Sequence, residues 1–217
     1  MTLDVATSVP DQSLGPADSG AATQDAAAPL SLQLREQTAE LHREVERSMG
    51  LPQNIGSLAQ YQACLDRFHR FYQPYEELLG RFDDWPEWEI DLHNRAHAPD
   101  LASDLEALET GNATAGPAPQ SAMPALPEFA HALGALYVTE GSTLGSQFIL
   151  RHLSEVLGQQ IAGADRFFRG YGPETGTRWS QIRAALDRFG RERPQQTPTV
   201  IEGAARTFQA IGKWMAT

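Results

Sequence analysis

The sequence predicts an all-α protein with one folded domain. Its 217 residues suffice for a single sizeable core, and apolar side chains recur at helical spacing from about residue 32 onward. The alternation of apolar and polar residues that is typical of half-buried strands is absent, and no internal repeat is visible. The helical segments together indicate about six to eight helices.

The first thirty residues are predicted to form a disordered tail, followed by a domain over residues 31–217. Residues 1–30 are rich in Ala, Ser, Asp, Pro and Gln, and they contain no Lys or Arg. Without a basic start they do not resemble a secretory signal. No run approaches the roughly 18 apolar residues of a membrane helix. We therefore expect a cytoplasmic protein that does not engage the membrane.

Two helices are predicted in the first half of the domain. The first begins near Leu32, with Ser31 as its N-cap, and ends in MGLP at 49–52. The second runs from about residue 57 to 82, where aromatic and aliphatic residues form an apolar stripe, and Pro74 should kink it or end it early.

The remaining helices are separated by loops rich in proline and glycine. DDWPEWEIDLHN, residues 83–94, reads as a loop or short helix, and residues 100–109 as a short helix. A long helix is predicted from about 128 to 157, and FFRGYGPETG interrupts the pattern after it. Segments 178–189 and 198–214 complete the predicted helices.

Charge and cysteine content exclude several functions. The net charge is −11, so the surface repels phosphate backbones and nucleic acid is not an expected partner. The single cysteine, Cys64, rules out an intramolecular disulfide. Because it lies in the apolar pattern YQACLDRF, we expect a small buried residue rather than a nucleophile.

The stretch YVTEGSTLGSQFI places Gly141 and Gly145 four residues apart inside the long helix. Each glycine costs a helix about 0.5–1 kcal/mol relative to alanine. Such a pair serves either close packing between helices or the approach of a ligand to bare main chain. The hydroxyls of Ser142, Thr143 and Ser146 could bend the helix or hold water.

Two histidines compete as candidate ligands of a haem iron. His42 lies eight residues after Leu34 and three before Val45, which places it on the apolar face of its helix. His69 also falls beside an apolar stripe. Either is a core histidine or an axial ligand, since a neutral imidazole on an apolar face suits an iron–nitrogen bond. Periodicity does not choose between them.

Other metal patterns are weaker. His93 and His97 have a metal-compatible spacing but lie in a polar segment, and Glu128 with His131 forms only half of a di-iron pattern. No glycine-rich phosphate loop, CxxC pair or nucleophile elbow is present.

Several segments resemble haem oxygenases. LREQTAELHREVE (34–46) resembles their proximal helix, and LYVTEGSTLGSQFI (136–149) resembles the distal helix of bacterial members. Residues 61–76 and 167–186 fit the same bacterial pattern, so the resemblance runs from about residue 31 to the C-terminus. It implies a single-domain, multi-helix bundle that holds haem between a proximal helix and a kinked distal helix.

The resemblance assigns roles on both faces of the haem. His42, rather than His69, occupies the position of the axial ligand of the haem iron. Gly141 and Gly145 occupy the distal positions that contact haem. Ser142 stands where animal members have an aspartate that organises distal water, which leaves the proton relay open.

Further positions match residues at the rim of the haem site. Arg35 and Arg183 are implied to hold the two haem propionates, with Arg178 as a weaker alternative to Arg183. Phe208 is implied to line the pocket. Arginine suits carboxylates because its guanidinium binds them bidentately.

The implied activity is the opening of haem b, which is both substrate and cofactor, to biliverdin, CO and ferrous iron. The reaction needs O₂ and electrons from an external reductase or ferredoxin. The product would serve iron acquisition or a bilin-dependent photoreceptor. Two alternatives stay open at this stage: a non-catalytic haem-binding carrier or sensor, and a helical interaction protein in which the glycines only pack helices.

Overall fold

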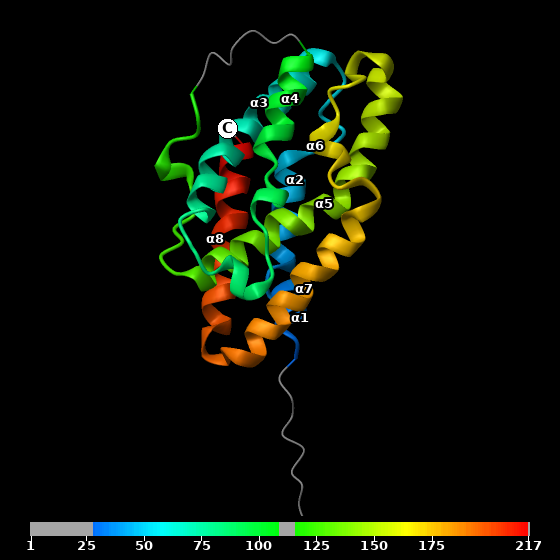
Figure 1. Cartoon of the computed structure of the whole chain (residues 1–217). Coiled ribbons are helices and arrows are strands. Elements are labelled where there is room, and N and C mark those ends of the chain that lie inside the picture. Colours follow the sequence, from blue (N-terminus) through cyan, green and yellow to red (C-terminus); the bar gives the residue numbers. More distant parts are fainter. Residues whose placement is uncertain (1–27, 109–115, 217) are drawn as a thin grey trace, which may run out of the picture.

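The computed structural model describes residues 28–108 and 116–216, and all regular elements in these ranges are helical. Figure 1 shows them gathered into one bundle. The α-helices are α1 (Leu30–Gln37), α2 (Ala39–Met49), α3 (Leu58–Leu79), α4 (Ala98–Ala107), α5 (Phe129–Leu157), α6 (Arg166–Arg169), α7 (Thr175–Glu192) and α8 (Thr197–Met215). Short 3₁₀ turns η1 to η6 connect them.

Helix α8 is the base on which two other helices rest. It packs closely against α5 and against α2. Against α5 the contact is between main chains. A Cβ on Gly134 would lie 1.8 Å from the Val200 carbonyl oxygen, and one on Gly203 would lie 2.1 Å from the His131 carbonyl oxygen. Only glycine permits this approach, so the first half of α5 is held rigidly to α8.

The first predicted helix is in fact two helices. The chain breaks at Thr38, whose φ is −105° and ψ is 2°, and the Thr38 hydroxyl donates to the Leu34 carbonyl at 2.7 Å. Ser31 is not the N-cap that the sequence suggested, because Leu30 already belongs to α1. Instead the Ser31 N–H donates to Asp187 of α7 at 2.8 Å.

Carboxylates from distant segments cap three helix N-termini. Besides Asp187 at α1, Glu76 of α3 accepts the N–H groups of His97 and Ala98 at the start of α4. Asp104 accepts the N–H groups of Arg166 and Phe167 at 2.9 Å each, where α6 begins. Negative charge at these positions satisfies free N–H groups and complements the helix dipole.

Helix α3 has the predicted apolar stripe but not the predicted interruption. It continues through Pro74 to Leu79, and burial of its aromatic face holds it together. The Arg70 carbonyl, to which Pro74 cannot donate, accepts the Ala118 N–H at 2.8 Å instead. The predicted helices at 100–109, 128–157, 178–189 and 198–214 correspond to α4, α5, α7 and α8. Residues 83–94 hold the 3₁₀ turn η1 (Trp85–Trp88) and the start of η2 (His93–Arg95).

Three further expectations concern the tail, membrane-spanning helices and Cys64. Most of the predicted tail, residues 1–27, lies outside the described residues. None of the helices that the structure describes is long and apolar enough to cross a membrane. Cys64 is partly buried, and burial raises the pKa of its thiol to about 12, which fits a packing role.

Replacing glycine with alanine should have opposite effects on the free energy of unfolding of the haem-free protein at two positions. Gly203→Ala should lower the free energy of unfolding by about 3 kcal/mol, because the new methyl group collides with the main chain of α5. Gly145→Ala should raise it by about 0.5–1 kcal/mol, since a Cβ there meets nothing within 4 Å and alanine favours the helix. Urea titrations of both variants check this, and equal effects would contradict the packing described.

Candidate functional site

His42 lies on α2 at the boundary between core and solvent. Its side chain is 52% exposed, and its ring meets the Phe208 ring of α8 edge-on, with centroids 5.7 Å apart. The Nδ1 atom is 3.6 Å from the Glu46 carboxylate one turn later. The neighbouring Val45 is buried. His42 is therefore an accessible imidazole beside an apolar wall, not a core histidine.

The second half of α5 presents an open face without side chains at its centre. A Cβ on Gly141 would touch the Trp179 ring of α7 at 3.6 Å, whereas one on Gly145 would meet nothing within 4 Å. Leu144 and Phe148 are 50% and 59% exposed. Large apolar side chains exposed side by side are typical of a binding surface.

Hydroxyl groups weaken the helix at the same place. Ser142 donates to the Thr139 carbonyl at 2.7 Å, and Thr143 donates to the Glu140 carbonyl at 2.6 Å. Ser146 donates to the Ser142 carbonyl at 3.2 Å. Such bonds back to the preceding turn bend helices. In Figure 1, α5 crosses the bundle and then turns upward along its edge, so its second half leaves the direction set by its contact with α8.

The two predicted segments come together at Thr38 and Tyr137. The Tyr137 hydroxyl of α5 lies close enough to the side chain of Thr38, where α1 passes into α2, for Thr38 to lower the Tyr137 pKa against the larger upward effect of burial. His42 lies one turn beyond Thr38, to whose carbonyl its own N–H donates at 2.9 Å. Gly141 likewise lies one turn beyond Tyr137. The structure thus places His42 and the glycine pair on two helices that start from a common contact.

The predicted rim residues lie on three helices, α1, α7 and α8. Arg35 is exposed and its positive charge lowers the pKa of Tyr137, against the larger upward effect of burial, which places it beside the Thr38–Tyr137 contact. Arg183 is exposed on α7, where its guanidinium donates to the Ser180 hydroxyl at 3.2 Å. Phe208 adjoins His42.

A comparison with models of known families matches the heme oxygenase model over residues 28–217. The chain belongs to the haem oxygenase family. Members of this family are oxidoreductases that open haem to biliverdin. The resemblance seen in the sequence is therefore confirmed, and with it the all-α haem oxygenase fold.

Solved structures agree on the fold. The haem oxygenase of Neisseria meningitidis, crystallised with NO and CO, is 19% identical with a TM-score of 0.71, and the alignment covers 87% of this chain and 91% of that one. The haem oxygenase of Leptospira interrogans is 18% identical with a TM-score of 0.63, covering 87% and 98%. A sequence search among curated proteins finds no match.

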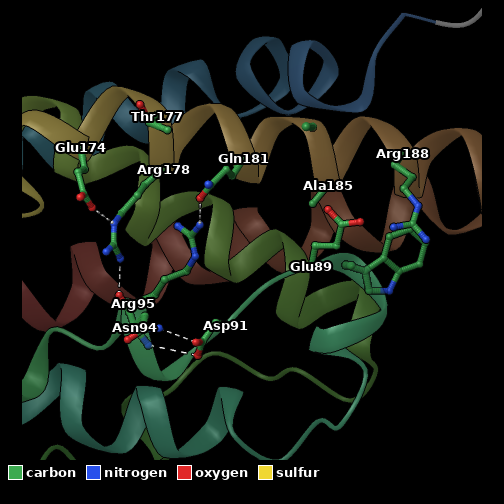
Figure 2. A pocket seen from close by; sticks show the side chains of 12 residues that line it. Glu89, Asp91, Asn94, Arg95, Glu174, Thr177, Arg178, Gln181, Ala185 and Arg188 are labelled. Atoms are coloured by element: carbon green, nitrogen blue, oxygen red, sulfur yellow. Dashed lines mark hydrogen bonds and ion pairs between the residues drawn. The ribbon is translucent and has the colours of Figure 1, made fainter.

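A groove of about 620 Å³ lies elsewhere, between α7 and residues 88–95. Figure 2 shows Arg178, Gln181 and Arg188 pointing into it from α7. Arg178 is held there by Glu174 at 3.1 Å and by the Asn94 carbonyl at 2.6 Å. By helical spacing this side of α7 is opposite to Arg183, so the structure gives no support to Arg178 as a partner of the haem site.

Sequence reasoning missed a buried polar cluster directly before Gly141. The Glu140 carboxylate pairs with the Arg95 guanidinium and accepts the Tyr171 hydroxyl at 2.7 Å. Arg95 also donates to Gln181 at 3.0 Å. The available signal was a single acid in the apolar run 129–140. The cluster connects α5 with α7 and with η2 directly before Gly141.

The other histidines do not form metal sites. Among the described residues no three His, Cys, Asp or Glu side chains are grouped as metal ligands. His69 is partly buried on α3, and His131 faces Glu202 at 3.6 Å. His97 is buried, contrary to the polar environment expected from its sequence neighbours, because α3 and the α6–α7 region cover it with aromatic rings.

The buried cluster should dominate the stability of this region. Glu140→Ala leaves the Arg95 charge buried without its partner, and we expect a loss of about 3–5 kcal/mol in the free energy of unfolding. Glu174→Ala removes an exposed carboxylate of the Arg178 pair and should cost less than about 1 kcal/mol. Chemical denaturation of the two variants measures both, and similar losses would contradict the assigned roles.

Proposed function

We propose that this chain opens haem held between His42 and the main chain of residues 141–145. The observation that carries the proposal is that α2 and α5 come together at Thr38 and Tyr137, one turn before His42 and Gly141. One helix bears an accessible imidazole, and the other bears an open glycine face. Both features fit a flat, apolar macrocycle with a metal at its centre, which needs one nitrogen donor and a close approach on the other side.

His42 is suited to hold the iron. Its Nδ1 lies near the Glu46 carboxylate, which can accept the ring N–H and so leave Nε2 free as a donor. A carboxylate behind a ligating histidine fixes the tautomer and raises the basicity of the ligand. Phe208, edge-on to the ring, limits its rotation.

The glycine face is suited to cover the other side. Absence of a Cβ at Gly145 leaves room next to the helix axis, and Ser142 places a hydroxyl between the two glycines. Leu144 and Phe148 offer apolar surface to the macrocycle, whereas Trp179 closes the side near Gly141. Unequal walls of this kind expose one edge of the ring and shield the others, which is the requirement for opening at a single carbon.

The exposed guanidinium groups are suited to the haem carboxylates. Arg35 lies near the helix junction and Arg183 on the adjacent α7. Each can bind a propionate bidentately and so fix the rotation of the ring in its plane.

When bound, haem supplies the iron and the O₂ chemistry as well as the carbon skeleton that is opened. The protein orients it, excludes bulk water and delivers protons. In this proposal the electrons come from an external reductase or ferredoxin. Biliverdin would then pass to iron metabolism or to a bilin-dependent photoreceptor.

Replacing each candidate histidine tests the axial assignment. His42→Ala should abolish the histidine-ligated absorption spectrum of the haem complex and the formation of biliverdin. His69→Ala, on a helix that bears no part of the proposed site, should keep both. The reverse outcome would show that His69 is the ligand.

The same assay distinguishes an enzyme from a non-catalytic haem carrier. The carrier is an alternative because Ser142 replaces the aspartate that organises distal water in animal members. With reductant and O₂ the Soret band of the wild-type complex should vanish as a broad red biliverdin band grows. A Soret band that persists through several reducing equivalents would establish a non-catalytic haem carrier.

A larger side chain at position 145 tests the proposed contact between haem and the main chain of α5. Gly145→Val should slow haem breakdown on the order of 100-fold, because the branched side chain displaces the macrocycle from its reacting position. Haem ligation by His42 should persist in its absorption spectrum. Wild-type turnover by this variant would contradict the proposed contact.

A further inference from the structure

The groove between α7 and residues 88–95 takes no part in the proposed haem site. Its volume of about 620 Å³ falls within the roughly 300–1,000 Å³ of small-molecule sites. Ala184 and Ala185 supply only small side chains to the α7 wall, so the middle of the groove stays open. Its described lining residues include no histidine, cysteine, methionine or tyrosine, so the groove offers haem iron no axial ligand of the usual kind.

Two arginines of α7 stand at the two ends of the groove (Figure 2). Arg178 donates to the Asn94 carbonyl at 2.6 Å, and Arg188 donates to the Glu87 carbonyl at 3.1 Å. Each also donates to a glutamate four residues away in the sequence. A guanidinium has five N–H donors, so each arginine keeps further donors for an anionic ligand. The two Cα atoms lie about 15 Å apart, because ten helical steps separate residues 178 and 188.

Aromatic rings hold both guanidinium groups in position. The guanidinium carbon of Arg178 lies 4.4 Å from the centre of the Tyr171 ring, and that of Arg188 lies 4.9 Å from the centre of the Trp88 ring. Such contacts fix the arginines before a ligand arrives, which lowers the entropy that is lost on binding.

Trp88 also leaves one polar atom beside the groove without a partner. The residue is 1% exposed, and its Nε1 finds no acceptor in the described part of the chain. A buried donor without an acceptor costs free energy. A ligand oxygen at this end of the groove would satisfy it.

The wall opposite α7 places one carboxylate between the two arginines. Figure 2 shows the Glu89 side chain pointing toward Ala185 of α7. Glu89 has φ 58° and ψ 32°, in the left-handed region that is unfavourable for a residue with a side chain. Its carboxylate forms no hydrogen bond or ion pair with the residues that the structure describes. The groove therefore combines a free acceptor at its middle with donors at both ends.

This arrangement selects a ligand with two carboxylates and with N–H groups between them. Haem has the carboxylates, but its four nitrogens bind iron and carry no proton for Glu89. The open-chain tetrapyrrole that haem oxygenases form has lost the iron, so it has both the carboxylates and the central N–H groups. Its conjugated rings also suit a groove that Trp88 borders.

We propose that the groove is a second site that binds the biliverdin product, with its propionates on Arg178 and Arg188 and its N–H groups on Glu89. The choice of this ligand rests on the proposed function. A product held here leaves the haem site free for the next substrate. It also stays at the surface, where a bilin-accepting partner can take it up.

Biliverdin binding is best measured on the complex with ferric haem and without reductant, because the haem site is then filled. One equivalent of added biliverdin should bind and gain circular dichroism in its red band. Free biliverdin has none, since it is an equal mixture of both twists. Binding that occurs only in the haem-free protein, and is lost when haem is added, would overturn the proposal.

The two arginines should each contribute to this affinity. Arg178→Gln and Arg188→Gln should each raise the Kd of biliverdin about tenfold, because each removes a charge-assisted pair with a propionate. Arg191→Gln is the matched control, since Arg191 is exposed on α7 outside the groove. It should match the wild type. Equal affinities in all four proteins would place biliverdin elsewhere and refute the site.

The sign of the effect at Glu89 separates a bilin site from a groove that merely attracts anions. Glu89→Gln should raise the Kd about fivefold, because the N–H groups lose an ionised acceptor. Glu87→Gln removes the same charge from a side chain outside the groove and should leave the Kd unchanged. An unchanged or lower Kd in Glu89→Gln would refute the contact with the central N–H groups.

The same titration stays decisive if the proposed function fails. A wild type that binds haem without opening it would refute that function, yet added biliverdin would still bind in the groove or not. If haem does not bind at all, the haem-free protein replaces the complex. There the groove variants should weaken biliverdin binding and Gly145→Val should not, whereas the reverse pattern would place biliverdin on the glycine face and refute the second site.

Discussion

The contact between the main chains of α5 and α8 is the constraint on which the rest of the site depends. Gly134 and Gly203 bring the two helices so close that neither can rotate or slide without collision. Helix α8 also carries α2, through Phe208 against His42 and Gly212 against Val45. The imidazole and the glycine face therefore share one rigid base, and their separation is set by the geometry of α8 rather than by a loop.

Glycine has two different roles along α5. At Gly134 it removes volume so that another helix can approach, and any larger residue would collide with the main chain. At Gly145 the helix loses stability without gaining a protein contact, since no atom lies within 4 Å of an added Cβ. The proposed function gives this glycine a role, since it assigns the bare main chain at Gly145 to contact with haem. The hydroxyl groups of Ser142 and Thr143 bond back to the preceding turn beside it, and such bonds bend helices.

Sequence periodicity predicted those features that depend on neighbours along the chain. The stripe on α3, the extent of α5 and the position of His42 beside an apolar wall follow from helical spacing. The caps from Asp187, Glu76 and Asp104 could not be predicted, because each carboxylate is far in sequence from the N–H group that it accepts. His97 shows the same limit most clearly. Its polar neighbours suggested exposure, whereas three aromatic rings from two distant segments bury it. The spacing of Gly141 and Gly145 could not distinguish helix packing from ligand contact, because the difference depends on which atoms lie opposite the two glycines.

A crystal structure of the haem complex tests the central claim most directly. The account predicts iron bonded to His42 Nε2, the macrocycle against the main chain of residues 141–145, and the Thr38–Tyr137 contact preserved. Haem bound by His69, or in the groove beside α7, with the glycine face left uncovered, would contradict it.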